Sequence, residues 1–300
     1  MIKRLVPLAL CWPLTASSDL AAVESVHAEL ARDVCPGKKS RLFGIAAHSS
    51  QVETYARWAR RARVVCEVGF SCGHSAATFL EANPDAVLLS FDFPTYPWAT
   101  AARAFFASRY GARFRIIDGD SEKTLPAFVR ANPQPRCDLV VVDGRHDYVH
   151  PLLDLVWLLQ IAHCNASIVL DDVCDPARCH AHHQGGRTFS GESKKGTNNE
   201  AVVGPTQAWA EARRLGYVRE EEAYFAEAAG GANDRGWVRG VHVCAADGSP
   251  KRPAARYSSE PIDVQFDPDR PTRAQQDRAQ QELEDARRRW GGRGHYESKR

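Results

Sequence analysis

The chain has 300 residues, of which 44% are hydrophobic and 25% charged, and its formal net charge is +2 at pH 7. These values are ordinary for a globular protein that is long enough to bury a sizeable core. They argue against a strongly basic surface of the kind that nucleic-acid-binding domains present, so no nucleic-acid partner is expected. No stretch approaches the roughly 20 apolar residues that a membrane-spanning helix requires, so no membrane span is expected.

The N-terminus has the features of a secretory signal peptide. Lys3 and Arg4 precede an apolar run from Leu5 to Leu14, and small residues follow it. A positive, then apolar, then small segment is typical of a cleaved leader. We therefore expect residues 1–18 to be a signal peptide and the mature chain to begin near Asp19, in the secretory pathway or outside the cell. The alternatives are an organelle transit peptide and an ordinary N-terminal segment.

Cysteine usage is compatible with an oxidising compartment. Nine cysteines include Cys11 in the predicted leader and leave eight for the mature chain, an even number that could form disulfides. Cys66 and Cys244 fall inside predicted strands, where a buried free thiol is the alternative. The pairing does not follow from the sequence. A bridge between Cys174 and Cys179 and a substrate lid are both open interpretations of that segment.

After the leader, an N-terminal region of residues 19–62 contains two predicted helices, Leu20–Asp33 and Gln51–Ala62. Strands and helices then alternate. Continuously apolar strands that alternate with helices are typical of a parallel sheet covered on both faces. The expected fold is α/β, with a doubly wound, mostly parallel seven-stranded sheet of Rossmann-like form. The predicted strands are 63–69, 86–92, 113–118, 137–143 and 166–172, and the predicted helices are 74–82, 98–111, 121–131 and 149–162.

The remainder of the chain is less regular. Residues 174–200 are rich in Gly, His, Ser and Lys and predict a long loop, which in a compact domain is usually functional or disordered. A helix over 206–216 follows. Two strands, 217–225 and 237–244, then close the sheet and are expected to include an antiparallel pair.

These elements place the main domain at residues 63–246. Residues 247–300 are polar, with Pro-rich and Arg/Glu-rich stretches, and predict a largely disordered or helical tail with little core. A solvated helix over Asp277–Trp290 is the one element expected in the tail.

Acidic residues end each of the five predicted parallel strands. Ligands of open α/β sheets bind beyond the carboxyl ends of the strands, so these acids are expected to line one site. A single acid at such a position is most often a helix cap, but five strands in succession favour a functional site. The acids are Glu67, Asp92, Asp118 with Asp120, Asp143, and the pair Asp171 and Asp172.

The turn after the first strand does not fit a dinucleotide-binding protein. The fingerprint for NAD and FAD is G-x-G-x-x-G, whereas this chain has Gly69 and Gly73 without the middle glycine. Glu67 would also lie near the phosphates of a dinucleotide, where a carboxylate is repelled. S-adenosylmethionine is a better match, because acids can neutralise its positive charge and accept hydrogen bonds from its ribose hydroxyls and amines.

Five segments at the strand ends together resemble a known enzyme family. They are "EVGFSCGHSA", Asp92, "IDGDSEKTLPAF", "CDLVVVDGRHDYVHPLLDL" and "SIVLDDV". In these segments the chain resembles class I S-adenosylmethionine-dependent methyltransferases, specifically the catechol O-methyltransferase-like and small-molecule or sugar O-methyltransferase branch. The resemblance covers residues 43–244. It implies transfer of a methyl group from S-adenosylmethionine to a hydroxyl of a small molecule or sugar.

The resemblance assigns cofactor-binding roles to the first turn. Gly69 and Gly73 would give the cofactor close access to the backbone. Ser75, at the head of the next helix, would hold the methionine carboxylate with help from the helix N-terminus. Glu67 would support the glycine turn and the amino end of the cofactor.

Two further positions complete the implied cofactor site. Asp92 would accept hydrogen bonds from both ribose hydroxyls, and Asp120 and Ser121 would flank the adenine. In metal-dependent members of the branch, acids that end the fourth and fifth strands hold a divalent cation. The matching residues here are Asp143, Asp171 and Asp172.

Mg²⁺ is the expected ion because carboxylate oxygens are hard ligands, with Mn²⁺ or Ca²⁺ as alternatives. Asp172 stands where the family usually has Asn, and it could instead only cap the following segment. His146 takes the place of the family's lysine base and would accept the proton of the acceptor hydroxyl. The alternative for His146 is a capping or surface role. The expected catalytic residues are thus Asp143 and His146.

Two rival functions remain open at this stage. One is a metal-dependent α/β enzyme of another reaction type, such as a hydrolase or hydroxylase, and the other is a non-catalytic binding protein of the same fold. Ser75 and Asp92 favour the methyltransferase over the first rival, and His146 with three acids favours an enzyme over the second. Asn165-Ala166-Ser167 is an N-glycosylation sequon at the beginning of a predicted strand, where its accessibility is an open question.

Overall fold

The computed structural model describes residues 16–36, 49–94, 98–134, 136–174, 200–225 and 236–247. The first 15 residues of the predicted leader lie outside this part of the chain. So do nearly all of the predicted 174–200 loop and the predicted helix Asp277–Trp290. Expectations for these segments therefore stay predictions.

A seven-stranded sheet forms the centre of the fold, with the strand order β3-β2-β1-β4-β5-β7-β6. Strands β1 to β5 are parallel, and β7 runs antiparallel to both β5 and β6. The strands are β1 (Val64–Val68), β2 (Val87–Asp92), β3 (Phe114–Asp118), β4 (Cys137–Val142), β5 (Ala162–Val173), β6 (Val218–Phe225) and β7 (Gly236–His242). The predicted mostly parallel, doubly wound sheet with an antiparallel pair is confirmed.

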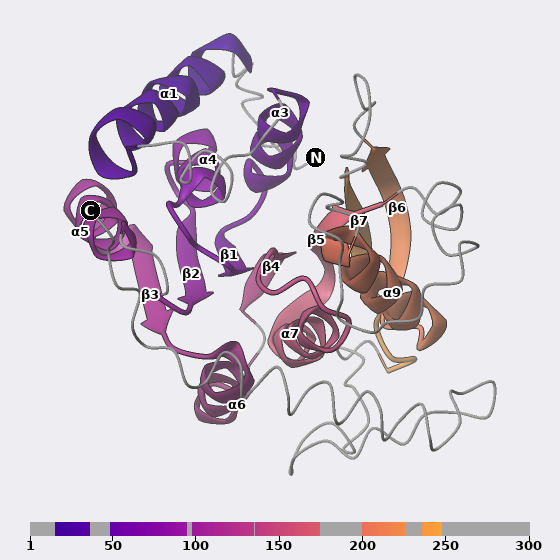
Figure 1. Cartoon of the computed structure of the whole chain (residues 1–300). Coiled ribbons are helices and arrows are strands. Elements are labelled where there is room, and N and C mark those ends of the chain that lie inside the picture. Colours follow the sequence, from indigo (N-terminus) through magenta and orange to yellow (C-terminus); the bar gives the residue numbers. More distant parts are fainter. Residues whose placement is uncertain are drawn as a thin grey trace, which may run out of the picture.

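Helices lie on both faces of this sheet (Figure 1). Alternate strand residues face opposite sides, so the sheet separates two buried cores. Val65 and Leu139 pack in the core with α1, α3, α4 and α5, whereas Cys66 and Val140 pack in the core with α6, α7 and α9. The helices are α1 (Ala16–Glu29), η1 (Leu30–Val34), α3 (Ser49–Ala59), α4 (His74–Ala82), α5 (Ala99–Tyr110), η2 (Gly111–Arg113), α6 (Ser121–Ala131), α7 (Val149–Leu159) and α9 (Glu200–Arg214). Within the described residues, none of these helices could span a bilayer.

One difference from the predicted elements is at the junction of α7 and β5. The predicted helix 149–162 ends at Leu159, and the predicted strand 166–172 begins four residues earlier, at Ala162. Ala162 pairs with Cys137, and the register then shifts before Ser167 pairs with Leu139. The early part of β5 was not predicted because its polar residues and the bulge interrupt the apolar pattern.

Helix α9 also begins earlier than predicted, at Glu200 rather than residue 206. Gly204 and Pro205 lie within it, and both residues normally argue against a helix interior. Gly204 has a specific packing role, because an added Cβ would lie 2.3 Å from the carbonyl oxygen of His146. Glycine therefore lets α9 pack directly against the loop that follows β4.

Disulfides connect distant parts of this fold. Three bridges join Cys35 to Cys72, Cys66 to Cys137 and Cys164 to Cys244. The alternative of free buried thiols at Cys66 and Cys244 is therefore wrong. Cys174 is also disulfide-bonded, but Cys179, its suggested partner, lies outside the described residues.

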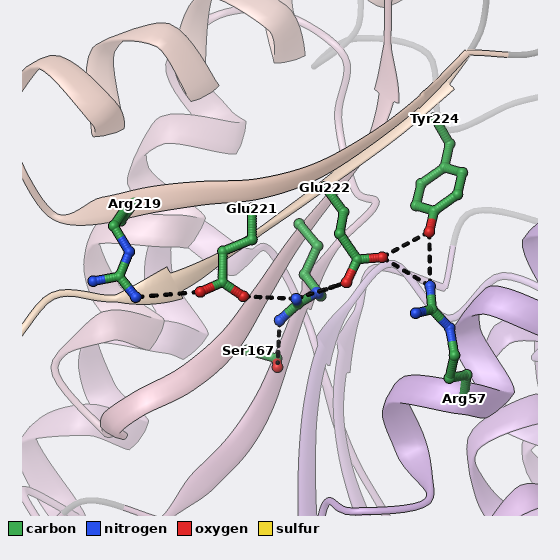
Figure 2. Close-up of polar contacts among 7 residues, drawn as sticks. Arg57, Ser167, Arg219, Glu221, Glu222 and Tyr224 are labelled. Carbon is green, nitrogen blue, oxygen red and sulfur yellow. Dashed lines mark hydrogen bonds and ion pairs between the residues drawn. The ribbon is translucent and has the colours of Figure 1, made fainter.

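A polar network attaches α3 to the antiparallel end of the sheet (Figure 2). Arg57 on α3 donates to Glu222 at 2.8 Å and to the hydroxyl of Tyr224 at 2.7 Å, both on β6. Arg239 on β7 also donates to Glu222, at 2.7 Å. Desolvation raises the pKa of Glu222, but hydrogen bonds from Tyr224, Arg57 and Arg239 outweigh it and lower that pKa to about 2. Each exposed pair stabilises little alone, but the connected network fixes where α3 lies.

Candidate active site

The turn after β1 packs against the loop after β4 through Gly69. Gly69 has φ +97°, and an added Cβ would lie only 1.9 Å from the carbonyl oxygen of Asp143. The amide of Asp143 donates to the carbonyl of Val68 at 2.9 Å. No other residue type could occupy position 69 without moving Asp143. The turn expected to bind the cofactor and the acid expected to bind the metal are therefore fixed together.

The other end of this turn is held by aromatic rings and a disulfide. Gly73 has φ +84° and precedes α4, and an added Cβ would lie 2.5 Å from the ring of Phe106 and 2.9 Å from that of Phe70. Cys72 is fully buried and bridges to Cys35, directly after the first N-terminal helices. The N-terminal region therefore contributes to the shape of the turn.

Glu67 is fully buried at the carboxyl end of β1. Its carboxyl accepts a hydrogen bond from Ser75 on α4 and another, at 3.0 Å, from Ser90 on β2. Desolvation raises the pKa of Glu67 to about 7, and the two serine hydroxyls lower it only in part. Glu67 thus connects β1 to α4 and β2 next to the turn. Ser75, which was expected to hold the methionine carboxylate, binds Glu67 in this structure.

Asp92 ends β2 beside the same turn. It accepts from the backbone amide of Phe70 at 3.2 Å and from Arg103 on α5 at 2.8 Å. Arg103 also donates to Asp118 at 2.6 Å, so one guanidinium joins the acids that end β2 and β3. Desolvation raises the pKa of Asp92, although Arg103 and the amides of Phe70 and Ser71 oppose the shift. Arg103 was not identified from the sequence.

Asp120 and Ser121 lie at the beginning of α6. Asp120 is the N-cap, and its carboxylate accepts from the amide of Glu122 at 3.2 Å. Ser121 donates to Asp154, a buried acid on α7. Desolvation raises the pKa of Asp154 to about 7, with the Ser121 hydrogen bond opposing it. The sequence did not identify Asp154, although a lone acid within the apolar run "PLLDLVWLL" was the available signal.

A charged cluster next to this helix N-terminus was also missed. His150 is buried, and its ring nitrogens lie 2.6 Å from Asp147 and 2.9 Å from Glu122. Arg145 also contacts the ring, at 2.6 Å. Burial lowers the pKa of His150, but the hydrogen bonds to Asp147 and Glu122 outweigh it and raise that pKa to about 9. Asp147 and Glu122 thus favour a protonated His150, and the charge of Arg145 opposes it.

Asp143, His146 and Asp172 converge where β4 and β5 end. One potential ligand atom from each of the three lies within 4.8 Å of the others. His146 Nε2 lies 2.9 Å from Asp172 Oδ2 and 4.0 Å from Asp143 Oδ1. Asp172 adopts φ +54°, a left-handed conformation that Asn and Asp tolerate better than other side chains. The predicted metal ligands Asp143 and Asp172 are therefore brought together with the predicted base.

Asp171, the third predicted metal ligand, lies outside this group of three. Its Oδ2 accepts from Gln51 at 2.6 Å and from the hydroxyl of Tyr55 at 2.9 Å, and its Oδ1 accepts from the amide of Asp172. Desolvation and the neighbouring Asp172 raise the pKa of Asp171 to about 7. Gln51 and Tyr55 were not identified from the sequence, although their spacing of four residues places them on one side of α3.

Part of the chain is similar to a known protein family. Residues 66–173 match a family model described as a methyltransferase domain, a segment that runs from β1 to the end of β5. No curated protein shows significant sequence similarity to the chain.

Several solved structures share the fold. An O-methyltransferase from Bacillus cereus in complex with SAH is 14% identical, with a TM-score of 0.51, and the match covers 73% of this chain and 99% of that one. The O-methyltransferase TomG from Streptomyces achromogenes, in complex with SAM, is involved in tomaymycin synthesis. It is 18% identical, with a TM-score of 0.50, and the match covers 76% of this chain and 96% of that one. A third structure, of a protein from Klebsiella pneumoniae, is described as that of a provisionally assigned O-methyltransferase. It is 16% identical, with a TM-score of 0.51, and the match covers 73% of this chain and 97% of that one.

Proposed function

We propose that the chain is a class I S-adenosylmethionine-dependent methyltransferase that methylates a hydroxyl of a small molecule or sugar with the aid of a divalent cation, which the match of residues 66–173 to a methyltransferase-domain model supports. The observation that supports this most is the convergence of Asp143, His146 and Asp172 next to the Gly69 turn. A methyl donor on the turn and a hydroxyl near the three polar side chains would then be neighbours. Such proximity is the main requirement of a direct transfer.

The cofactor would lie over the carboxyl ends of β1 to β3. S-adenosylmethionine supplies a methyl group on a positively charged sulfur. Asp92 would accept from the ribose hydroxyls, and the amide of Phe70 and the guanidinium of Arg103 hold its carboxylate in place at the end of β2. Asp120, the N-cap of α6, and Ser121, its first residue, would flank the adenine. Buried Glu67 would support the glycine turn and the amino end of the donor.

The donor set at the ends of β4 and β5 fits a divalent cation. Asp143 and Asp172 offer carboxylate oxygens, which suit Mg²⁺ or Mn²⁺. Asp171 is the third proposed ligand; it directly precedes Asp172 in β5, and Gln51 and Tyr55 hold its carboxylate in one orientation. A bound cation would lower the pKa of the acceptor hydroxyl and orient it.

His146 would accept the proton that leaves the acceptor. Its ring is one-third exposed, so an acceptor can reach it, and its Nε2 lies 2.9 Å from Asp172. Asp172 would orient the imidazole and stabilise it once protonated. The acceptor oxygen would then attack the methyl carbon in line with the departing sulfur. Gly204 lets α9 pack against the His146 loop.

We also propose that the protein matures in the secretory pathway. The predicted leader of residues 1–18 supports this, as do the bridges Cys35–Cys72, Cys66–Cys137 and Cys164–Cys244, because disulfides persist mainly in oxidising compartments. N-terminal sequencing of the protein from a eukaryotic host tests the proposal. A mature chain beginning near Asp19 is expected, and an intact Met1 on a cytosolic product would contradict it.

Methyl transfer itself is tested with S-adenosylmethionine labelled in its methyl group. The protein is incubated with catechols, phenols and monosaccharides, first with Mg²⁺ and then with a chelator in excess. We expect labelled product from at least one hydroxyl compound, loss of transfer with the chelator, and recovery when Mg²⁺ or Mn²⁺ is restored. Transfer that is unaffected by the chelator would contradict the cation's role, and labelling of amines alone would contradict the hydroxyl assignment.

A further inference from the structure

Asn165 lies in the early part of β5. The chain has six asparagines, and only Asn165 is followed two residues later by Ser or Thr. The intervening residue, Ala166, is not proline, so Asn165-Ala166-Ser167 is a complete sequon. We propose that Asn165 carries an N-linked glycan, a modification that rests on the proposed secretory location.

The conformation of Asn165 keeps a glycan compatible with the folded sheet. Asn165 adopts φ +60° within the register shift that separates the Ala162–Cys137 pair from the Ser167–Leu139 pair. Its side chain is exposed, whereas Ala166 next to it is buried. A residue in such a bulge stands outside the regular ladder, so a large attachment there leaves the strand pairing intact. Asn165 is therefore accessible in the folded protein, which resolves the question that the sequence left open.

Space next to Asn165 is also available. The residue lines a cavity of about 240 Å³ together with Trp58, Arg61, Asp138 and His163. An indole and several polar groups are suitable neighbours for the first sugar of a glycan, since sugars have both apolar faces and hydroxyls. The cavity lies at the opposite end of β5 from Asp171 and Asp172. Asn165 and Asp171 are six residue steps apart along β5, or about 20 Å at the usual rise.

The disulfide next to Asn165 also favours passage through the secretory pathway. Cys164 precedes Asn165 and is disulfide-bonded to Cys244, which follows β7. N-glycosylation takes place on the nascent chain in the compartment where disulfides form. Arg239 contacts the hydroxyl of Ser167 at 3.4 Å. This contact forms only in the folded sheet, so it does not block recognition of the sequon when the glycan is transferred to the nascent chain.

The chemistry needs a sugar donor carried on a lipid pyrophosphate. The side-chain amide nitrogen of Asn165 forms a bond to the anomeric carbon of the donor sugar. The bond from that carbon to the pyrophosphate oxygen breaks, its electron pair leaves with the pyrophosphate, and the amide nitrogen loses one proton. No oxidant or reductant is involved.

The test is expression of the full chain in insect or mammalian cells, once with its own leader and once with a heterologous secretory leader in front of it. Variants Asn165→Gln and Ser167→Ala remove the sequon, and Ser167→Thr retains it. The products are compared before and after treatment with peptide N-glycosidase, and the peptide containing residue 165 is identified by mass spectrometry.

We expect one glycosidase-sensitive glycan on the wild type and on Ser167→Thr, and none on Asn165→Gln or Ser167→Ala. Conversion of Asn165 to aspartate on glycan release would locate it. A secreted wild type without a glycan behind the heterologous leader overturns the inference. If a glycan is present only behind the heterologous leader, Asn165 stands as a site and the secretory proposal for the native leader fails. Affinity for S-adenosylmethionine should be the same with and without the glycan.

Discussion

His146 Nε2 lies 2.9 Å from the carboxylate of Asp172, which joins the loop after β4 to the end of β5. The same imidazole lies 4.0 Å from Asp143, three residues earlier in the chain. A carboxylate at this distance can hold the imidazole ring in one orientation toward an acceptor hydroxyl. This relationship is the basis of the proton-transfer role that we propose for His146.

Replacing His146 should therefore slow the chemical step without weakening cofactor binding. We expect His146→Ala to lower kcat by about 10²–10⁴-fold, the usual contribution of a positioned general base. The loss should shrink at high pH, where the acceptor hydroxyl ionises without help. Steady-state rates across pH, with the affinity for S-adenosylhomocysteine measured separately, test this. A variant that keeps the wild-type rate and pH profile would leave His146 with a structural role only.

Asp92 should determine the affinity for the cofactor. Loss of a carboxylate that accepts ribose hydroxyls should weaken S-adenosylmethionine binding by about 1.5–3 kcal/mol in Asp92→Ala. Asp118→Asn is the matched control, because Asp118 shares Arg103 with Asp92 but is half-exposed and ends the neighbouring strand. Calorimetric titration should separate the two variants. Equal affinities in folded Asp92→Ala and wild type would contradict the assignment.

Glu67 should make the protein less stable as the pH rises. Burial raises its pKa from 4.5 to about 7, so the folded state holds a proton that the unfolded chain has lost between these values. The stability from this proton is fully present below pH 4.5 and is lost as the pH rises through about 7. Glu67→Gln keeps an acceptor for Ser75 and Ser90 and should make the decline shallower.

Chemical denaturation at several pH values between 4.5 and 8 measures this effect. Glu53→Gln, on an exposed position of α3, is the control and should follow the wild type. Asp154 and Asp171, whose pKa values are also raised to about 7 by burial, should sustain part of the decline in both variants. Identical pH dependence in Glu67→Gln and wild type would show that Glu67 does not titrate in this range.

The Cys35–Cys72 bridge should matter for cofactor binding as well as for stability. Chain-entropy arguments give about 4 kcal/mol of stability for this bridge and for Cys164–Cys244 alike, with sequence separations of 37 and 80 residues. Only Cys72 lies in the glycine turn. We expect the double variant Cys35→Ser/Cys72→Ser to bind S-adenosylmethionine more weakly. The control Cys164→Ser/Cys244→Ser should lose stability but retain affinity, and an equal loss in both would contradict a specific role for the turn.

Much of the fold could be predicted because its signals are local. The apolar runs around Val65, Leu89 and Val140 identified parallel strands, and each was bounded by a turn or an acid. The beginning of β5 could not be predicted, because Asn165 and the bulge depend on pairing with β4. Helix α9 was predicted too short because Gly204 packs against a loop that is distant in sequence.

In the candidate site, too, residues with a local sequence signal could be predicted, and residues placed by tertiary packing could not. Strand-end acids such as Asp92 and Asp143 could be identified because the carboxyl ends of parallel strands lie at the same edge of a sheet. Their partners could not, since Arg103, Gln51 and Tyr55 reach them only through tertiary packing. Those three residues lie on amphipathic helices, where a polar side chain facing a site is indistinguishable in sequence from one facing solvent.

The central claim is that Asp143, Asp171 and Asp172 hold a divalent cation, with His146 free to act as the base. Electron paramagnetic resonance of Mn²⁺ titrated into the protein, without acceptor or turnover, tests it most directly. We expect the wild type to bind one Mn²⁺, His146→Ala to retain it, and Asp143→Asn and Asp172→Asn each to weaken binding by at least about tenfold. Asp138→Asn, at the opposite end of β4, is the control. A wild type that does not bind Mn²⁺, or an Asp143→Asn variant that binds it as tightly as the wild type, would contradict the account.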